Sequence, residues 1–251
     1  MRIEARGQTD VGQKREHNED SFLVCPELGL FVVADGMGGH AGGGTASRIA
    51  VQTIETRMRV AREASPELFA SPGTLEESAI PELLRESVES ACESIYQEAQ
   101  GNPSLTGMGT TVTAAVIAGR KVFVAHVGDS RCYLARAGRI YQVSEDHSLV
   151  NEQLKAGAIT PDEARHSRLR NIITRSVGFE SDVAVDLLGL DLEPGDRVVI
   201  CCDGLSNLVE DDEILDVVTA TPLDAAPQRL IDLANERGGD DNITVIVVEI
   251  G

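Results

Sequence analysis

Residues 31–40, FVVADGMGGH, decide the fold and contain the first candidate for a functional side chain. Four apolar residues stop at Asp35, and three of the next four residues are glycine. A short apolar run that ends at turn residues predicts a buried strand. The glycines predict a backbone that turns tightly and approaches a ligand closely. Asp35 is therefore expected at the end of a core strand, beside free backbone carbonyls, in surroundings that suit a hard divalent cation.

The same pattern, an apolar strand with an acidic residue at one end, occurs three more times. It is found in residues 121–129 (KVFVAHVGD), 197–204 (RVVICCDG) and 238–248 (GGDDNITVIVV). One Asp-Gly after a strand is more often a turn than a ligand, because short motifs match by chance. Four strand-end acids together predict an oxygen-rich cluster at one edge of a sheet. Carboxylates gathered in this way repel one another, so the cluster needs cations.

The composition excludes several classes of function. The chain of 251 residues holds 41 acidic and 22 basic side chains, a net charge of −19. Nucleic acid is not an expected partner, because phosphate backbones require a basic face. Five cysteines without a CxxC pair, and no pattern of a secretory signal, predict a cytoplasmic protein. No apolar run reaches the length of a membrane-spanning helix, so no membrane partner is expected.

The order of apolar patterns predicts antiparallel strands and two pairs of helices. Strands are expected over 3–9, 21–25, 31–34, 107–118, 122–127, 184–190, 197–202 and 242–250, with two more around the turn at 137–138. Helices are expected over 45–62, 80–100, 211–219 and 222–237, with a short one within 144–157 and a loop over 64–78. The economical arrangement is an α+β fold: a four-layer α-β-β-α sandwich of two antiparallel sheets flanked by helix pairs, made by a single domain over 1–251.

One segment reverses the charge of the chain. Residues 158–176 are basic, with Arg165, His166, Arg168, Arg170 and Arg175. Such a run is either a solvated charged helix or a flap that binds an anion, and the residues alone leave both interpretations open.

Five motifs together resemble one family. DGMGGHAGG, GMGTTV, GDSR, CDGL and DDNIT, in this order and preceded by residues 15–20, are similar to the type 2C family of metal-dependent serine/threonine protein phosphatases, in its compact bacterial form. The resemblance runs from about residue 9 to residue 248. It implies the four-layer fold, metals at one edge of the β-sandwich, a flap at about 145–176, and hydrolysis of phosphoserine and phosphothreonine.

The resemblance also implies roles for individual residues. The cofactors would be two Mn²⁺ or Mg²⁺ ions, with a third, weaker site, and a hydroxide between the two main ions would attack phosphorus directly. The metal-binding set would be Asp35 as the bridge, the carbonyl of Gly36, Asp203 and Asp241, then Glu19 and Asp20 through water, and Asp129 at the third site. Asp241 is preferred to Asp240 because the family's ligand directly precedes Asn. Arg15 corresponds to the arginine that grips the substrate phosphate, and Arg170 of the basic segment is expected to contact substrate.

The source of the proton for the leaving oxygen is open. Many eukaryotic members have His directly after Asp-Gly, where this chain has Met37, which cannot donate a proton. His40 lies three residues later, and it donates a proton, contacts substrate or is structural. Water bound to a metal is the other candidate acid.

Three readings of the function compete. A two-metal phosphodiesterase or nuclease is disfavoured by the acidic charge. A phosphoprotein-binding regulatory protein with little or no turnover is the alternative to an active phosphatase, but it predicts missing ligands, and Asp35, Asp203 and Asp241 are present. The favoured reading is a cytoplasmic, monomeric enzyme whose partners are phosphorylated proteins, among them a serine/threonine kinase and its substrates.

Overall fold

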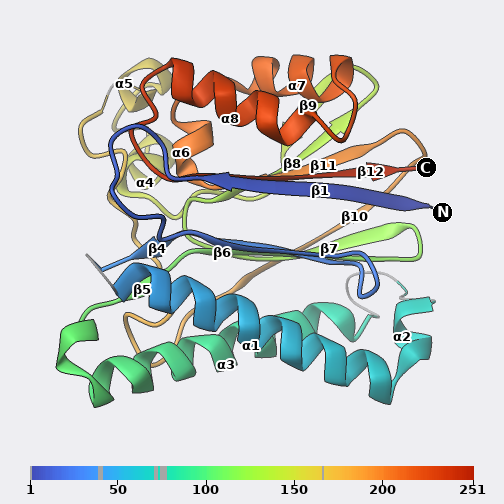
Figure 1. The fold of residues 1–251 in the computed structure, drawn as a ribbon, viewed down its shortest axis with the longest axis horizontal. Helices are drawn as coiled ribbons and strands as arrows, with labels where there is room; N and C mark the ends of the chain where they lie inside the picture. The colour runs from blue at the N-terminus through green and yellow to red at the C-terminus, as the bar shows by residue number, and fades with distance from the viewer. Residues whose placement is uncertain (1, 39–41, 71–72, 74–77, 166) are drawn as a thin grey trace.

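Two five-stranded antiparallel sheets pack face to face, and helices cover both outer faces (Figure 1). The computed structural model describes residues 2–38, 42–70, 73, 78–165 and 167–251. This architecture confirms the α+β prediction, including the layer order seen in Figure 1. The part of the chain that the structure describes contains no helix long and apolar enough to cross a membrane.

The first sheet contains the strand of the opening motif. Its order is β10 (Asp186–Asp191), β7 (Lys121–Val127), β6 (Val112–Ala118), β3 (Leu30–Ala34) and β2 (Ser21–Cys25). Every residue of β3 is buried. Successive side chains point to opposite faces, so Phe31 and Val33 pack between the sheets while Val32 and Ala34 pack under the helices. A strand buried on both faces needs the continuous apolar run seen in the sequence.

The second sheet joins the two ends of the chain. Its order is β1 (Ile3–Asp10), β12 (Ile243–Ile250), β11 (Arg197–Cys201), β8 (Arg131–Arg136) and β9 (Arg139–Gln142). β1 and β12 pair along their whole length, from Ile3 opposite Ile250 to Asp10 opposite Ile243. The faces of the two sheets that meet form an apolar core.

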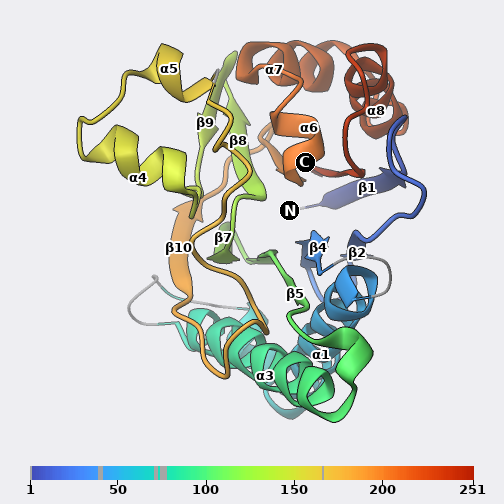
Figure 2. The ribbon, with the colours of Figure 1, turned by 90° about the vertical axis from the view of Figure 1, so that its left-hand side faces the viewer.

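Amphipathic helices bury the outer face of each sheet. α1 (Gly42–Ala64) and α3 (Ile80–Gly101) cover the first sheet, and α7 (Asp211–Ala220) and α8 (Ala226–Glu236) cover the second. The shorter helices are α2 (Pro66–Ala70), α4 (Leu149–Lys155), α5 (Pro161–Arg165), α6 (Asp203–Ser206) and the 3-10 turn Pro103–Leu105. α4 and α5 lie within the predicted flap and stand beside β8 and β9 at one side of the molecule (Figure 2).

Three local predictions were wrong. The expected loop 64–78 contains α2, and the last helix begins at Ala226 because residues 222–225 form a turn before Pro227. The expected strand 107–118 is two strands, β5 (Gly109–Thr110) and β6, and β5 pairs with the short β4 (Gly36–Met37). The break between β5 and β6 lies at Thr111, whose N–H donates to the carbonyl of Asp35 at 2.8 Å, directly after the end of β3.

Candidate metal centre

Acidic residues from five segments meet at one edge of the sandwich. Asp20 precedes β2, Asp35 follows β3, Asp129 lies between β7 and β8, Asp203 begins α6 and Asp241 precedes β12. The charges of the other four all act on the Asp35 carboxyl. The antiparallel order brings these strand ends to the same edge, which faces the viewer in Figure 2.

Burial and mutual repulsion make the ionised cluster costly. Burial, and then the charges of Asp20 and Asp203, raise the pKa of Asp35 well above its ordinary value. Burial also raises the pKa of Asp20 to about 7 and raises the pKa values of Asp129 and Asp203. The charge of Asp203 acts directly on the Asp35 carboxyl, so ionisation of one disfavours ionisation of the other. Cations would remove this cost.

Three buried carboxylate oxygens have no hydrogen-bond partner among the described residues: Glu19 Oε1, Asp20 Oδ1 and Asp203 Oδ1. The second oxygen of Asp20 accepts from Thr244 Oγ1 at 2.6 Å, and that of Asp203 accepts from Asn207 Nδ2 at 2.9 Å. One oxygen of each aspartate is therefore fixed while the other is left without a donor. Buried polar atoms are almost always satisfied, so these oxygens fit a hard cation or its bound water.

Glycines bring the backbone of the first motif close to α1. A Cβ on Gly43 would lie 2.7 Å from the Gly36 carbonyl oxygen and 2.9 Å from Glu19 Oε1, both shorter than real Cβ contacts. The start of α1 thus packs directly against the Gly36 peptide and the Glu19 carboxylate and fixes their positions. The sequence did not assign this role to Gly43.

Asn242 ties three loops of the centre together. Its Oδ1 accepts the N–H of Glu19 at 2.8 Å, and its Nδ2 donates to the carbonyls of Val11 and His17, each at 3.0 Å. In the sequence, Asn242 serves only as a marker for Asp241. Its presence in the DDNIT motif was the one available signal.

Arg15 reaches the centre from the loop after β1. Its Nη2 lies 2.6 Å from Asp241 Oδ2, and its side chain stays 51% exposed. The other oxygen of Asp241 accepts the N–H of Asn242 at 2.9 Å. Asp241 therefore differs from Asp20 and Asp203, because both of its oxygens are engaged.

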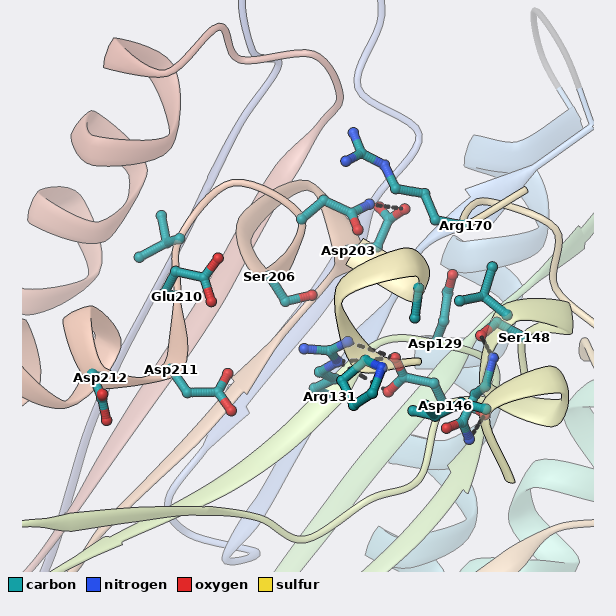
Figure 3. A pocket seen from close by; sticks show the side chains of 17 residues that line it. Asp129, Arg131, Asp146, Ser148, Arg170, Asp203, Ser206, Glu210, Asp211 and Asp212 are labelled. Carbon is teal, nitrogen blue, oxygen red and sulfur yellow. Dashed lines mark hydrogen bonds and ion pairs between the residues drawn. The ribbon is translucent and has the colours of Figure 1, made fainter. Parts of the chain in front are cut away.

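A cavity of about 510 Å³ opens beside the acidic cluster, between the predicted flap and helices α6 and α7 (Figure 3). Asp129 and Asp203 line it together with Arg170, and Arg170 favours the ionised form of Asp203. Arg131 and Asp146 form a bidentate ion pair in its wall, with the closest contact 2.7 Å. The structure thus brings one basic residue of the flap next to the carboxylates.

The thiol of Cys202 lies beside two of the acids. Its Sγ lies with Asp20 and Asp35 in a group whose candidate ligand atoms are all within 4.8 Å of one another. The thiol donates to the carbonyl of Asn242 at 3.3 Å, and burial raises its pKa well above the ordinary value. Because the thiol is engaged with the Asn242 carbonyl, the remaining candidate ligands are oxygens, which favour Mg²⁺ or Mn²⁺ over zinc. All five cysteines of the chain are free and buried.

His40 and His166 lie outside the described residues. The other predicted site residues gather around the acidic cluster: Gly36 in β4 and Glu19 both pack against Gly43, Arg15 contacts Asp241, and Arg170 lines the cavity with Asp129 and Asp203.

The chain is similar to known protein phosphatases over almost its full length. Residues 8–241 match the family described as "Protein phosphatase 2C". The serine/threonine phosphatase stp of Listeria monocytogenes is 37% identical over 251 residues, covering 98% of this chain and 96% of the relative. The crystal structure of the Mycobacterium tuberculosis serine/threonine phosphatase PstP/Ppp is 33% identical with a TM-score of 0.87, covering 99% and 98% of the two chains.

A further solved structure bears on the metals. The catalytic domain of the serine threonine protein phosphatase PstP, in complex with two manganese ions, is 32% identical with a TM-score of 0.84, and the match covers 99% of each chain. Fold, strand-end acids and sequence similarity agree, and the chain belongs to the protein phosphatase 2C family of metal-dependent serine/threonine protein phosphatases.

Proposed function

We propose that the chain hydrolyses phosphoserine and phosphothreonine in proteins with two Mn²⁺ or Mg²⁺ ions. The residues that would hold the ions are Asp35, which both ions would share, the carbonyl of Gly36, Asp203 and Asp241. Glu19 and Asp20 hold water of the metal shells, and Asp129 serves a third, weaker site. The observation that carries this assignment is the set of buried carboxylate oxygens without a hydrogen-bond donor, next to an Asp35 whose ionised form needs compensation.

The reaction needs a nucleophile, a phosphate grip and a proton donor. The two ions would supply a water of lowered pKa as the nucleophile that attacks phosphorus, and would offset charge on the phosphoryl oxygens. Arg15 binds phosphoryl oxygens with its guanidinium, which is suited to a bidentate contact. Arg15 Nη2 contacts Asp241 Oδ2, so use of that oxygen to hold a cation would leave the guanidinium free for substrate. The proton for the leaving oxygen comes from His40 or from water, because Met37 has none to give.

The cavity beside the carboxylates is the proposed route of the substrate protein. It leads from the flap (residues 145–176) to Asp129 and Asp203, and Arg170 lies on its wall. We assign Arg170 to substrate contact there. The substrates are phosphorylated proteins, including a serine/threonine kinase of the same cell and its targets, on the ground of family membership. Residues 1–251 act as one catalytic domain, as a monomer in the cytoplasm.

The test is hydrolysis of a phosphothreonine peptide in chelator, followed by addition of Mn²⁺ or Mg²⁺. We expect turnover only after metal is added. Asp35→Asn should lose turnover by at least about 1,000-fold, as expected when a ligand shared by both ions is removed, and should keep the fold, as checked by circular dichroism. Turnover in chelator, or normal activity of Asp35→Asn, contradicts the assignment. Peptide binding without turnover under any divalent ion would favour the phosphoprotein-binding alternative.

A further inference from the structure

His147 stands at a junction of the chain that the proposed reaction does not use. It is 8% exposed and makes four hydrogen bonds. Its N–H donates to the carbonyl of Gly128 at 2.8 Å, and its carbonyl accepts the N–H of Thr174 at 2.8 Å. In its ring, Nδ1 accepts the N–H of Gly128 at 3.0 Å, and Nε2 lies 3.1 Å from Asp186 Oδ2.

These bonds fix the protonation of the ring. An amide N–H can only donate, so Nδ1 carries no proton and accepts from Gly128. Nε2 faces a carboxylate and therefore donates to Asp186. The ring is the neutral Nε2–H tautomer, in agreement with a pKa that burial lowers. Both ring bonds are made only in this form.

The junction joins the two ends of the flap. His147 lies near its start and Thr174 near its end, and between them the N–H of Leu149 donates to the carbonyl of Ile172 at 2.9 Å. Asp186, on β10, accepts from His147 with one oxygen and from Arg175 Nη1 with the other, at 2.6 Å. The Nε2 bond of His147 therefore leads, through Asp186, to the segment that carries Arg170.

The junction also holds the loop before Asp129. Gly128 exchanges two hydrogen bonds with His147. Its φ is +109°, and a Cβ added there would lie 2.6 Å from Cβ and Cγ2 of Thr111, so the position has no room for a side chain. Asp129 follows directly, is 9% exposed and lines the cavity. The Nδ1 bond of His147 therefore leads to the carboxylate assigned to the weaker cation site.

We propose that His147 is a positioning residue with two separable bonds: Nδ1 fixes the Gly128–Asp129 loop for cation binding, and Nε2 fixes the end of the flap for substrate binding. The part concerning cations rests on the function proposed for Asp129. Groups that orient the ligands of a metal usually change metal affinity or activity by 10- to 100-fold when they are removed.

Three substitutions separate the two bonds. The amide oxygen of His147→Asn lies near the position of Nδ1 and accepts from Gly128, but the side chain does not reach Asp186. The amide nitrogen of His147→Gln lies near the position of Nε2 and donates to Asp186, but no acceptor faces Gly128. His147→Ala loses both bonds. Asp186→Asn weakens the Nε2 bond from the other side, and Asp191→Asn, at the far end of the same strand β10, is the matched control.

The first readout is amide hydrogen exchange in chelator, which needs no metal and no activity. In His147→Gln, we expect the N–H of Gly128 to exchange at least about 10-fold faster than in the wild type. In His147→Asn, we expect the same acceleration for the N–H of Thr174. The second readout is calorimetric titration with Mn²⁺: His147→Gln should weaken the weaker site about 10-fold, and His147→Asn less than about 2-fold.

The third readout is kinetic, with a phosphothreonine peptide at saturating Mn²⁺. KM should rise about 10-fold in His147→Asn and Asp186→Asn, and stay within about 2-fold in His147→Gln and Asp191→Asn. Equal defects in the Asn and Gln variants, or wild-type behaviour of His147→Ala, overturn the proposal. If the wild-type protein itself shows no turnover, the proposed function fails, while hydrogen exchange still decides whether His147 holds the two segments.

Discussion

Adjacent residues at the start of β12 have different surroundings. Asp240 is exposed, whereas Asp241 is partly buried and contacts Arg15. A carboxylate in open solvent is a poor cation ligand, because water competes for the ion and no second group holds the side chain in place. The preference for Asp241 over Asp240 as the metal ligand can therefore be tested by substitution.

We predict that Asp241→Asn raises the Mn²⁺ concentration for half-maximal activity at least about 10-fold. Asp240→Asn, which removes the same charge one residue earlier, should stay within about 2-fold of wild type. Manganese titrations of both variants with one phosphopeptide make the comparison. A larger effect of Asp240→Asn than of Asp241→Asn on the required Mn²⁺ concentration would identify Asp240 as the ligand.

Arg15 should act on substrate rather than on metal. We predict that Arg15→Ala raises KM for a phosphopeptide by about 10- to 100-fold, since a charge-assisted bidentate grip on phosphate is lost. Its effect on Mn²⁺ affinity should be smaller, because it competes with a cation for Asp241. Lys14→Ala removes a neighbouring exposed charge and serves as the control. A selective loss of metal binding in Arg15→Ala would show that the arginine supports the ligands instead.

The sequence predicted the acids but not the residues that hold them. Asp35 and Asp203 end apolar strands, so local patterns alone bring them to a sheet edge. The role of Asn242 depends on contacts with residues 11, 17 and 19, more than 200 positions away, and no local pattern contains that information. For the same reason the sequence predicted only a short helix within 144–157 and no role for His147.

At the scale of elements, the residues at the start of α1 suit close packing against the acidic centre better than they suit a stable helix. Gly43 and Gly44 are adjacent, yet a Cβ on Gly44 would meet nothing closer than 3.7 Å. Glycine inside a helix costs about 1 kcal/mol relative to alanine. Retaining glycine at position 43 therefore follows from packing against Gly36 and Glu19.

We predict opposite effects for the two alanine substitutions. Gly44→Ala should raise stability by up to about 1 kcal/mol and leave activity unchanged. Gly43→Ala should displace the Gly36 peptide and lower activity about 10- to 100-fold. Thermal melting and phosphopeptide hydrolysis test both. Equal activity in the two variants would remove Gly43 from the set that shapes the centre.

Helices and strands were predicted correctly where the pattern of apolar residues alone determines the structure. The strands of both sheets and the four long helices follow from apolar periodicity. The division into β5 and β6 did not, because it arises from the hydrogen bonds that Thr110 and Thr111 make to the Asp35 carbonyl across the sheet. Such breaks depend on tertiary contact and leave no mark on the pattern of apolar residues.

At the scale of the whole molecule, the acidic centre links stability to pH and metal. A carboxyl whose pKa is raised by folding keeps its proton in the folded chain over a range where the unfolded chain has lost it. Its contribution to stability therefore falls as pH rises from the ordinary 3.8 toward about 7, the pKa of Asp20. His126, whose pKa burial lowers to about 4, contributes in the opposite direction between that value and 6.5.

We predict that Mn²⁺ raises the melting temperature more at pH 7.5 than at pH 5.5, because at the lower pH it must displace protons from the carboxyls. The difference between melting in Mn²⁺ and in chelator, taken at each pH, cancels the contribution of His126. Each kcal/mol corresponds to roughly 2–4 °C for a chain of this size. A shift that is equal at both pH values would show that the carboxyls are already ionised without metal.

The pairing of β1 with β12 has a consequence for biosynthesis. Among the strands of this sheet, β1 leaves the ribosome first, yet β12, its hydrogen-bonded neighbour, is made last. The first sheet and its helices are complete in sequence once β10 has emerged, and until β12 arrives their inner apolar face lacks much of its cover. Contacts between distant segments also slow folding. The nascent chain should therefore depend on chaperones late in synthesis, and ribosomes that stop short of residue 243 should release a product destined for proteolysis.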